Sequence, residues 1–318
     1  MTDALSFTGE RFHPDLAGEM WAEHWHRYHF VLPLVAGKSV LDVASGEGYG
    51  SALMATVASS VNGVDVSGAA IEHAAQVYAD HHNLQFTEGS CAKLPFADAN
   101  FDVVVSFETI EHIFEQEEFL HEIKRVLKPS GLLIISSPNR AEYSDRRGYQ
   151  NEFHVKELDR AELAALIEVR FRHTRWFSQR NAFVSLIAPD AAGNYPVSAD
   201  VGETLTISKD KPDAIAIPRD ALYFLVVATN DDAAADQLSS RISVFTDREE
   251  WAYNDYRKIF QATQYYAKRE AELVARCGQL EQQMADLKSG TIEVPQAVSA
   301  PVEENESWLT RMAKRLGI

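Results

Sequence analysis

Short apolar runs alternate with longer amphipathic segments over the first two thirds of the chain. Apolar runs bounded by turn residues predict strands, which fall at 40–43, 61–65, 84–87, 101–106, 132–136, 171–177 and 221–228. The periodic segments predict helices at 49–58, 67–80 and 158–168. This alternation is typical of a mostly parallel sheet with helices on both faces. We therefore predict an α/β fold around a seven-stranded, mostly parallel sheet whose last strand pair is antiparallel at one edge.

Two segments lie outside this alternation. Apolar and aromatic residues recur with a helical period at Trp21, Trp25, Tyr28 and Leu32, which predicts a helix packed over the sheet as a lid. Residues 188–220 are rich in Pro, Gly, Asp and Lys, and we interpret them as an insertion before the last strand. In open α/β sheets ligands bind beyond the carboxyl ends of the strands, so we expect the chemistry in the loops that follow the strands.

A glycine loop follows the first predicted strand. Gly46, Gly48 and Gly50 are spaced two apart, directly after Asp42 and the strand end. Glycine lacks the Cβ that keeps a ligand off the backbone, and it permits positive φ in a tight turn. The loop differs from the dinucleotide fingerprint, because position 51 is serine. With Asp65 at the end of the second strand, the pattern predicts a nucleoside site whose ribose hydroxyls bind Asp65.

Five motifs together resemble the class I S-adenosylmethionine (SAM)-dependent methyltransferases. In that family's order they are Leu41-Asp42-Val43 with the glycine loop, Gly63-Val64-Asp65, Leu94-Pro95-Phe96, Phe101-Asp102-Val103-Val104-Val105 and Val126-Leu127-Lys128-Pro129-Ser130-Gly131. The resemblance implies a Rossmann-like fold and S-adenosyl-L-methionine as cofactor. The cofactor-binding residues implied are Arg27, Tyr28, Asp42, Ala44, Gly46, Gly48, Asp65, Val66, Ser90, Cys91, Ala92 and Phe107.

Two of these positions need comment. Many members of the family have an Asp where this chain has Ser90, so we expect backbone groups around Cys91 and Ala92 to hold the adenine. Arg27 suits the methionine carboxylate as a bidentate partner, provided that the lid helix covers the pocket.

A second polar cluster follows the fourth strand. Glu108, Glu111 and His112 stand at i, i+3 and i+4, so in one helical turn all three would project from a single face. Two carboxylates at that separation repel, and a cation between them would remove the repulsion. His154 lies in the loop after the fifth strand, on the same rim of the sheet. The sequence therefore predicts a mixed oxygen and nitrogen site for a divalent cation, Mg²⁺ or Mn²⁺.

The turn and the downstream histidine are similar to the metal site of small-RNA 2′-O-methyltransferases and, in part, of ubiquinone-pathway O-methyltransferases. That resemblance implies Glu108, Glu111, His112 and His154 as metal ligands, with His112 and Glu111 as catalytic residues. Two alternatives stay open. His112 could act as a metal-free general base, or the turn could be a solvated helix start whose carboxylates the helix dipole favours.

Composition limits the partners and the compartment. The 318 residues carry a formal net charge of −17, which argues against a nucleic-acid backbone as partner. The two cysteines, Cys91 and Cys277, have neither metal nor redox spacing, and the first residues lack the features of a signal peptide. Since no run reaches the length of a membrane span, we expect a cytoplasmic protein.

The C-terminal third predicts a long helix after a capping box at residues 246–249. Heptad positions are occupied by Tyr256, Ile259, Thr263, Tyr266, Glu270, Leu273, Cys277, Leu280, Met284 and Leu287. This pattern favours a homo-oligomeric coiled coil over a helix folded back on the first domain. We place the domains at 1–232, 233–288 for the coiled coil, 289–304 for a flexible linker and 305–318 for an amphipathic helix.

The final helix has an apolar face beside basic residues. Trp308, Leu309, Met312 and Leu316 share the face, and Arg311, Lys314 and Arg315 flank it. This arrangement indicates weak contact with a membrane surface or a partner groove. A frayed tail is the alternative.

A further set of motifs, followed by a coiled coil, resembles bacterial O-methyltransferases of surface-polysaccharide assembly. The motifs are Gly9-Glu10-Arg11-Phe12, Glu23-His24-x-x-Arg27-Tyr28, Phe107-Glu108-Thr109-Ile110-Glu111-His112, Ser137-Pro138-Asn139-Arg140 and Phe153-His154-Val155-Lys156-Glu157. Some enzymes of this kind cap an O-antigen chain and are held at the inner face of the cytoplasmic membrane by a C-terminal amphipathic segment, which the resemblance implies here. The implied reaction methylates a sugar hydroxyl at the non-reducing end of a glycan, and a glycosyltransferase is the implied protein partner. A second hypothesis is a small-molecule O-methyltransferase acting on a quinone precursor or catechol-like acceptor. A third is a non-catalytic scaffold of a glycan-assembly complex.

Overall fold

The computed structural model describes residues 19–181, 207–208, 211–215, 221–236, 243–245 and 251–289. The predicted capping box, the C-terminal amphipathic helix, nearly all of the predicted linker and most of the insertion lie outside these residues. The chain divides into two compact units, Met1–Ala252 and Tyr253–Ile318, which are described separately below.

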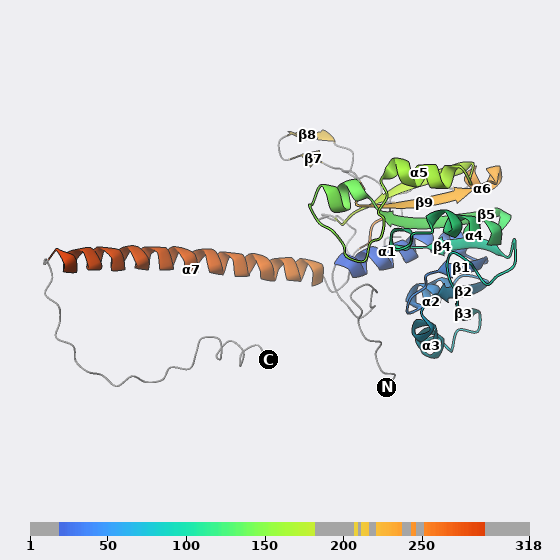
Figure 1. The fold of residues 1–318 in the computed structure, drawn as a ribbon, viewed down its shortest axis with the longest axis horizontal. Coiled ribbons are helices and arrows are strands. Elements are labelled where there is room, and N and C mark those ends of the chain that lie inside the picture. The colour runs from blue at the N-terminus through green and yellow to red at the C-terminus, as the bar shows by residue number, and fades with distance from the viewer. Residues whose placement is uncertain are drawn as a thin grey trace, which may run out of the picture. The chain divides into compact units, whose positions relative to one another are not determined.

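Seven strands form one sheet in the order β3-β2-β1-β4-β5-β9-β6 (Figure 1). Their bounds are β1 Ser39–Val43, β2 Ser60–Asp65, β3 Leu84–Glu88, β4 Phe101–Ser106, β5 Leu127–Pro138, β6 His173–Gln179 and β9 Tyr223–Thr229. The first five pair in parallel, whereas β9 is antiparallel to both β5 and β6. The predicted seven-stranded, mostly parallel sheet is confirmed, together with the antiparallel pair at one edge.

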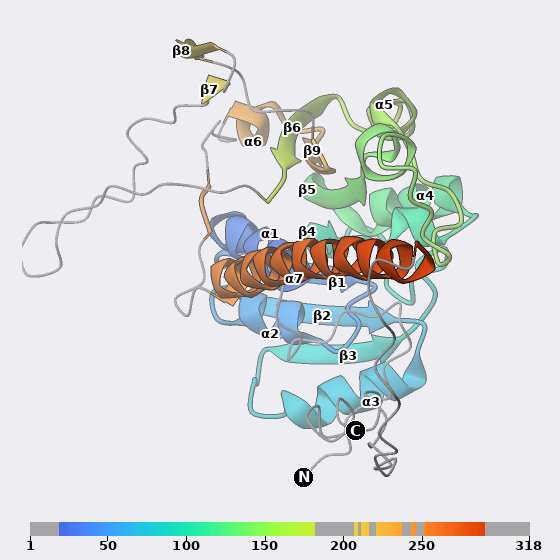
Figure 2. The same cartoon turned by 90° about the vertical axis from the view of Figure 1, so that its left-hand side faces the viewer.

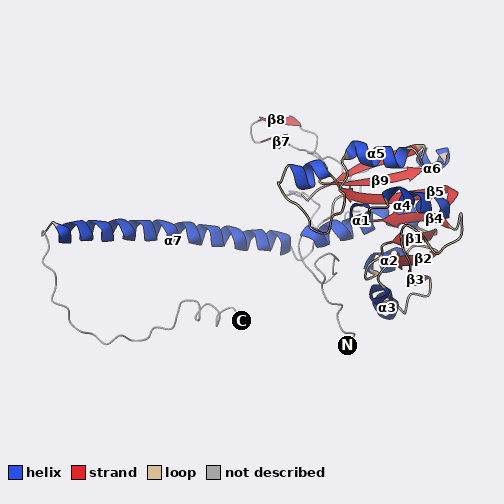
Figure 3. Ribbon diagram, viewed as in Figure 1, coloured by secondary structure: helices blue, strands red, loops and turns tan. Residues whose placement is uncertain are grey.

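In the first unit α1 precedes the strands, α2 to α5 lie between strands in sequence, and α6 follows β9 (Figure 3). They are α1 Glu19–Val35, α2 Tyr49–Ala55, α3 Gly68–Val77, α4 Gln116–Val126, α5 Arg160–Glu168 and α6 Asp232–Asp236, with short helical turns at Ile110–His112 (η1) and Ala141–Asp145 (η2). The helix expected at 158–168 begins at Arg160, because Asp159 and Glu162 form a reciprocal capping box. The helices expected at 49–58 and 67–80 are confirmed but shorter, and α1 confirms the helix predicted around residues 21–32.

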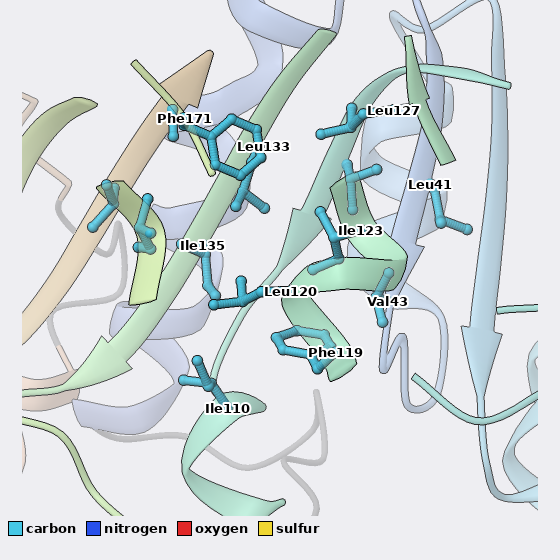
Figure 4. Close-up of a cluster of buried hydrophobic side chains, with 14 of the residues drawn as sticks. Leu41, Val43, Ile110, Phe119, Leu120, Ile123, Leu127, Leu133, Ile135 and Phe171 are labelled. Carbon is cyan, nitrogen blue, oxygen red and sulfur yellow. The ribbon is translucent and has the colours of Figure 1, made fainter. Parts of the chain in front are cut away.

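The strands bury side chains on both faces, and each face has its own hydrophobic cluster. On one face Phe119 and Ile123 of α4 and Leu163 of α5 pack on β1, β5 and β9 residues (Figure 4). On the other face Val31 of α1 and Met54 of α2 pack on alternate residues of the same strands. Burial on both faces explains why the central strands are continuous apolar runs.

Strands β1, β2 and β3 lie side by side at the end of the sheet that carries α3 (Figure 2). Short strands β7 Ile207–Ser208 and β8 Lys211–Ile215 form a separate antiparallel pair within the predicted insertion.

The second unit contains α7, which spans Trp251–Lys288. This helix confirms the long C-terminal helix expected from the sequence, whereas its coiled-coil pairing stays a prediction. None of the helices in the described ranges combines the length and the apolar character needed to cross a membrane.

Candidate active site

A cavity of about 410 Å³ opens at the carboxyl ends of the parallel strands. Residues that follow directly on β1, β2, β3 and β4 line it: Ala44, Val66, Gly89 and Phe107. The remaining lining residues used below are Tyr28, Ser45, Gly46, Asp65, Cys91, Glu108, Glu111, His112, Tyr143, Asn151, His154 and Tyr223. The cavity therefore lies where an open α/β sheet holds its ligand.

The glycine loop and Asp65 form one wall. The Gly46 N–H donates to Asp65 Oδ2 and the Ser67 N–H donates to Asp65 Oδ1, both at 2.9 Å, so backbone amides fix the carboxylate at the cavity edge. Gly46 and Gly48 both have positive φ, and a Cβ on Gly48 would lie 2.5 Å from Cζ of Phe86. The loop thus requires glycine both for its backbone conformation and for packing.

Asp42 supports this wall from below. Its side chain is fully buried, accepts a 2.6 Å hydrogen bond from the Ser51 hydroxyl and longer ones from the Tyr28 hydroxyl. Burial raises the pKa of the Asp42 carboxyl to about 7, although both hydroxyl donors act in the opposite direction. Asp42 does not line the cavity, so the structure places it beneath the loop rather than against a ligand.

Seven of the predicted cofactor-binding residues line the cavity and five do not. Those that line it are Tyr28, Ala44, Gly46, Asp65, Val66, Cys91 and Phe107, and those that do not are Arg27, Asp42, Gly48, Ser90 and Ala92. The Ser90 hydroxyl instead accepts a hydrogen bond from the Ala92 N–H, which shapes the loop beside Cys91.

Arg27 lies behind the cavity rather than in it. Its side chain is 2% exposed, donates to Gln179 Oε1 at 2.9 Å and lies 3.5 Å from Glu108 Oε1. The guanidinium also stacks over the ring of Tyr223 at 5.0 Å. These partners bury Arg27 behind the cavity wall, and its role as partner of the methionine carboxylate stays a prediction.

Glu108 departs from the local structure expected for the acidic turn. Its φ is +49°, and the helical turn η1 begins only at Ile110. The Glu108 carboxylate accepts a 2.6 Å hydrogen bond from the Ser136 hydroxyl and pairs with Arg27. The expectation that Glu108, Glu111 and His112 share one helical turn is therefore wrong, because Arg27 and Ser136 draw Glu108 to one side.

Glu111, His112 and His154 do come together. One ligand atom from each lies within 4.8 Å of the others, and the two imidazole rings meet edge to face at 4.9 Å. The loop that carries His154 is attached to η1, since the N–H groups of Val155 and Lys156 both donate to the Glu111 carbonyl. The prediction that His154 would reach the first cluster is borne out by this geometry, whereas the ligand role of these side chains stays a prediction.

Each imidazole is oriented by its Nδ1 atom. His112 Nδ1 lies 3.0 Å from the Phe153 carbonyl oxygen, which can only accept, so Nδ1 carries the proton. His154 Nδ1 lies 2.5 Å from Glu157 Oε1, a carboxylate that favours the same tautomer. His112 Nε2 lies 3.9 Å from Glu111 Oε1, and the Asn151 amide donates to His154 Nε2 at 3.0 Å.

Glu111 is the exceptional group in this cluster. Its side chain is fully buried, and neither carboxylate oxygen accepts a hydrogen bond from another residue. Burial, and then the charge of Glu108, raise the pKa of the Glu111 carboxyl well above its usual range. A buried carboxylate without donors is costly unless a proton or a cation compensates it.

The sequence did not indicate Tyr223 or Glu157 as residues of the site. Tyr143 stacks on His154 at 5.5 Å and contacts Tyr223, and both tyrosines line the cavity. The polar residues of loop 141–150, Tyr143 among them, indicate a substrate-facing loop from the sequence, but nothing in the sequence pairs Tyr143 with a residue 80 positions later. Glu157 could have been predicted from the sequence as a partner of His154, because it lies only three residues after it.

Residues 41–135 match the model of the methyltransferase domain family. The chain is 41% identical over 174 residues to a protein of Mycolicibacterium smegmatis named as a probable S-adenosylmethionine-dependent methyltransferase, covering 53% of this chain and 65% of that protein. It is 35% identical over 111 residues to the mitochondrial ubiquinone biosynthesis O-methyltransferase of Schizosaccharomyces pombe, covering 33% of this chain and 39% of that protein. The PH0226 protein of Pyrococcus horikoshii matches 70% of this chain and 99% of its own length, with 22% identity and a TM-score of 0.48.

The match to the family model indicates that residues 41–135 form a methyltransferase domain, and the similarity to the mycobacterial protein agrees with a SAM-dependent enzyme. The similarity to the mycobacterial protein spans just under two thirds of that protein's length.

Proposed function

We propose that this protein is a SAM-dependent O-methyltransferase that uses a divalent cation and methylates a sugar hydroxyl of a bacterial cell-surface polysaccharide. The observation that carries the proposal is the cluster of Glu111, His112 and His154, in which one ligand atom of each lies within 4.8 Å of the others and the buried carboxylate accepts no hydrogen bond from another residue. A carboxylate in that position is suited to bind a cation.

The residues present fit a divalent cation. Glu111, His112 and His154 would hold it, and the Phe153 carbonyl and the Glu157 carboxylate orient the two imidazoles from behind. A set of one carboxylate and two imidazoles suits Mn²⁺ and tolerates Mg²⁺, with positions left open toward the cavity. When bound, the cation would lower the pKa of an acceptor hydroxyl and orient it.

The acceptor side of the cavity supports a polar, hydroxyl-rich substrate. Its walls combine Asn151, Glu108 and the histidines with the rings of Tyr143 and Tyr223. Hydrogen-bonding groups beside tyrosine rings match a sugar, which has polar edges and an apolar face. Capping of an O-antigen chain is the specific form of this reaction suggested by the order of the sequence motifs.

A quinone precursor or another catechol-like acceptor is the second candidate. It is favoured by the sequence similarity to the S. pombe ubiquinone biosynthesis O-methyltransferase. The same three ligands would serve an acceptor with two neighbouring phenolic oxygens. Mass spectrometry of surface glycans and of quinones from a deletion strain separates the two: loss of a methyl ether from glycans supports our proposal, and a demethylated quinone contradicts it.

The metal is tested on the purified chain by calorimetric titration with Mn²⁺. We expect one Mn²⁺ per chain in the wild type and no binding in Glu111→Ala or His112→Ala, while SAM affinity stays nearly unchanged. Glu115→Ala is the matched control, because Glu115 is exposed and close in sequence. Methyl transfer should stop on treatment with a chelator and return with Mn²⁺.

Methyl transfer that persists in the presence of a chelator would contradict the metal-binding proposal and would support His112 as a metal-free general base. Absence of SAM binding to the wild type would support a scaffold instead of an enzyme.

A further inference from the structure

The Asn151 side chain uses both ends of its amide in the wall of the cavity. Its Oδ1 accepts from the Phe153 N–H at 3.1 Å, and its Nδ2 donates to His154 Nε2 at 3.0 Å. The first contact is an Asx-turn, and it decides which amide atom faces the histidine, because a backbone N–H can only donate. The Asn151 N–H therefore occupies the ring nitrogen of His154 that would face the cation.

Both ring nitrogens of His154 have partners in this arrangement. Nδ1 lies 2.5 Å from Glu157 Oε1, and Nε2 accepts from the Asn151 amide. A neutral imidazole has a single lone pair for bonding, on the nitrogen without a proton. His154 Nε2 therefore cannot accept from Asn151 and bind a cation at the same time, so a cation that uses His154 as a ligand must displace one of its two partners.

The contact with Asn151 is the weaker of the two. A hydrogen bond to a carboxylate is roughly twice as strong as one between neutral groups. The side chains of His154 and Glu157 are 9% and 8% exposed, so solvent screens their contact only slightly. Asn151 itself lines the cavity, which gives its amide room to rotate. The amide, and not the carboxylate, is therefore the group that a cation displaces.

We propose, resting on the metal site of the proposed function, that Asn151 blocks the Nε2 lone pair of His154 in the cation-free protein and rotates away when a cation binds. Each binding event then includes the loss of one hydrogen bond, so Asn151 lowers the affinity of the site for its cation. Asn151 is in this view neither a ligand nor a support of the cation. It is the residue that the cation must displace, and its removal should strengthen binding.

Asn151→Ser tests the proposal, because it separates the two contacts of the side chain. A serine hydroxyl can still accept from the Phe153 N–H, but it ends one bond closer to the backbone than the amide nitrogen that reaches His154. In calorimetric titration of the full-length chain we expect Asn151→Ser to bind Mn²⁺ about two- to tenfold more tightly than the wild type, the equivalent of one hydrogen bond. Gln150→Ser is the matched control, because Gln150 is the exposed neighbour, and its Mn²⁺ affinity should equal that of the wild type.

The direction of the change distinguishes this role from a structural one, because a loosened loop or a lost ligand would weaken Mn²⁺ binding. Equal or weaker binding by Asn151→Ser, with SAM affinity unchanged as the check on folding, would overturn the proposal and leave the metal site in place. Absence of Mn²⁺ binding in both the wild type and the variant would overturn the metal site and the role of Asn151 together. Binding by the variant alone would support the role of Asn151 and contradict the expected site in the wild type.

Discussion

Asp42 and Glu111 are both fully buried carboxylates near the same cavity, yet their surroundings are opposite. Asp42 accepts hydrogen bonds from Ser51 and Tyr28 and does not line the cavity. Glu111 lines the cavity and accepts none from another residue. Asp42 is therefore satisfied by hydroxyl donors of the protein, whereas Glu111 lacks donors from other residues, which is the feature on which our metal proposal rests.

This difference distinguishes carboxylates that hold the backbone in place from a carboxylate that is available to a ligand. In the cofactor half, carboxylates hold the glycine loop in shape through hydroxyl and amide donors. On the other side of the cavity, Arg27 pairs with the Glu108 carboxylate and the Ser136 hydroxyl donates to it, while Glu111 lies beside His112 and His154. Proteins keep a costly buried group of this kind where function requires it.

The substitution with the largest expected effect on the contrast between Asp42 and Glu111 is Glu111→Met. We expect methyl transfer to fall by about a thousandfold, near 4 kcal/mol, because the cation loses its carboxylate. The metal-free variant should also be more stable than the wild type by roughly 1–3 kcal/mol, since an apolar side chain replaces a buried carboxylate without donors. Methyl-transfer kinetics measure the first effect, and urea unfolding in the presence of a chelator measures the second. A variant that is less stable than the wild type would contradict the conclusion that the buried Glu111 carboxylate is costly.

The counterpart is Asp42→Asn, examined as a function of pH without SAM. Since the folded-state pKa of Asp42 is raised from 3.8 to about 7, folding favours its protonated form, and wild-type stability falls as pH rises from about 4 to 7. The full shift corresponds to at most about 4 kcal/mol. Asp42→Asn cannot titrate, so its melting temperature should change less between pH 5 and pH 8. Identical pH profiles would show that Asp42 does not titrate in this range.

Asp65 is the intermediate case, because backbone amides hold it while it still faces the cavity. We expect Asp65→Asn to weaken SAM binding by about ten- to a hundredfold, as one charge-assisted contact to the ribose is lost. The turnover number at saturating SAM should change little. Calorimetry measures the SAM affinity and initial rates measure the turnover number, so the two effects can be separated. Unchanged SAM affinity would remove Asp65 from the cofactor site.

The smallest effect is expected at Glu157, which orients His154 from behind. We expect Glu157→Gln to weaken Mn²⁺ binding about tenfold, because the amide is a poorer acceptor for the imidazole N–H. The control is Glu152→Gln, an exposed carboxylate of the same loop. Equal Mn²⁺ affinities in these two variants would show that Glu157 has no influence on the site.

Much of the molecule follows from local sequence pattern. The apolar runs, the positive-φ glycines and Asp65 at the end of β2 predict the sheet, the loop and the cofactor half, because strand burial and backbone conformation depend on neighbouring residues. The heptads predict the long helix α7 for the same reason.

The arrangement of Glu108 and of the two tyrosines at the cavity depends on tertiary contacts. Arg27 comes from α1 and Ser136 from β5, and together they turn Glu108 away from the helical turn that its spacing predicts. Tyr143 and Tyr223 meet across 80 residues. Whether a buried carboxylate has donors depends on side chains that folding brings together, so only the tertiary structure distinguishes Asp42 from Glu111.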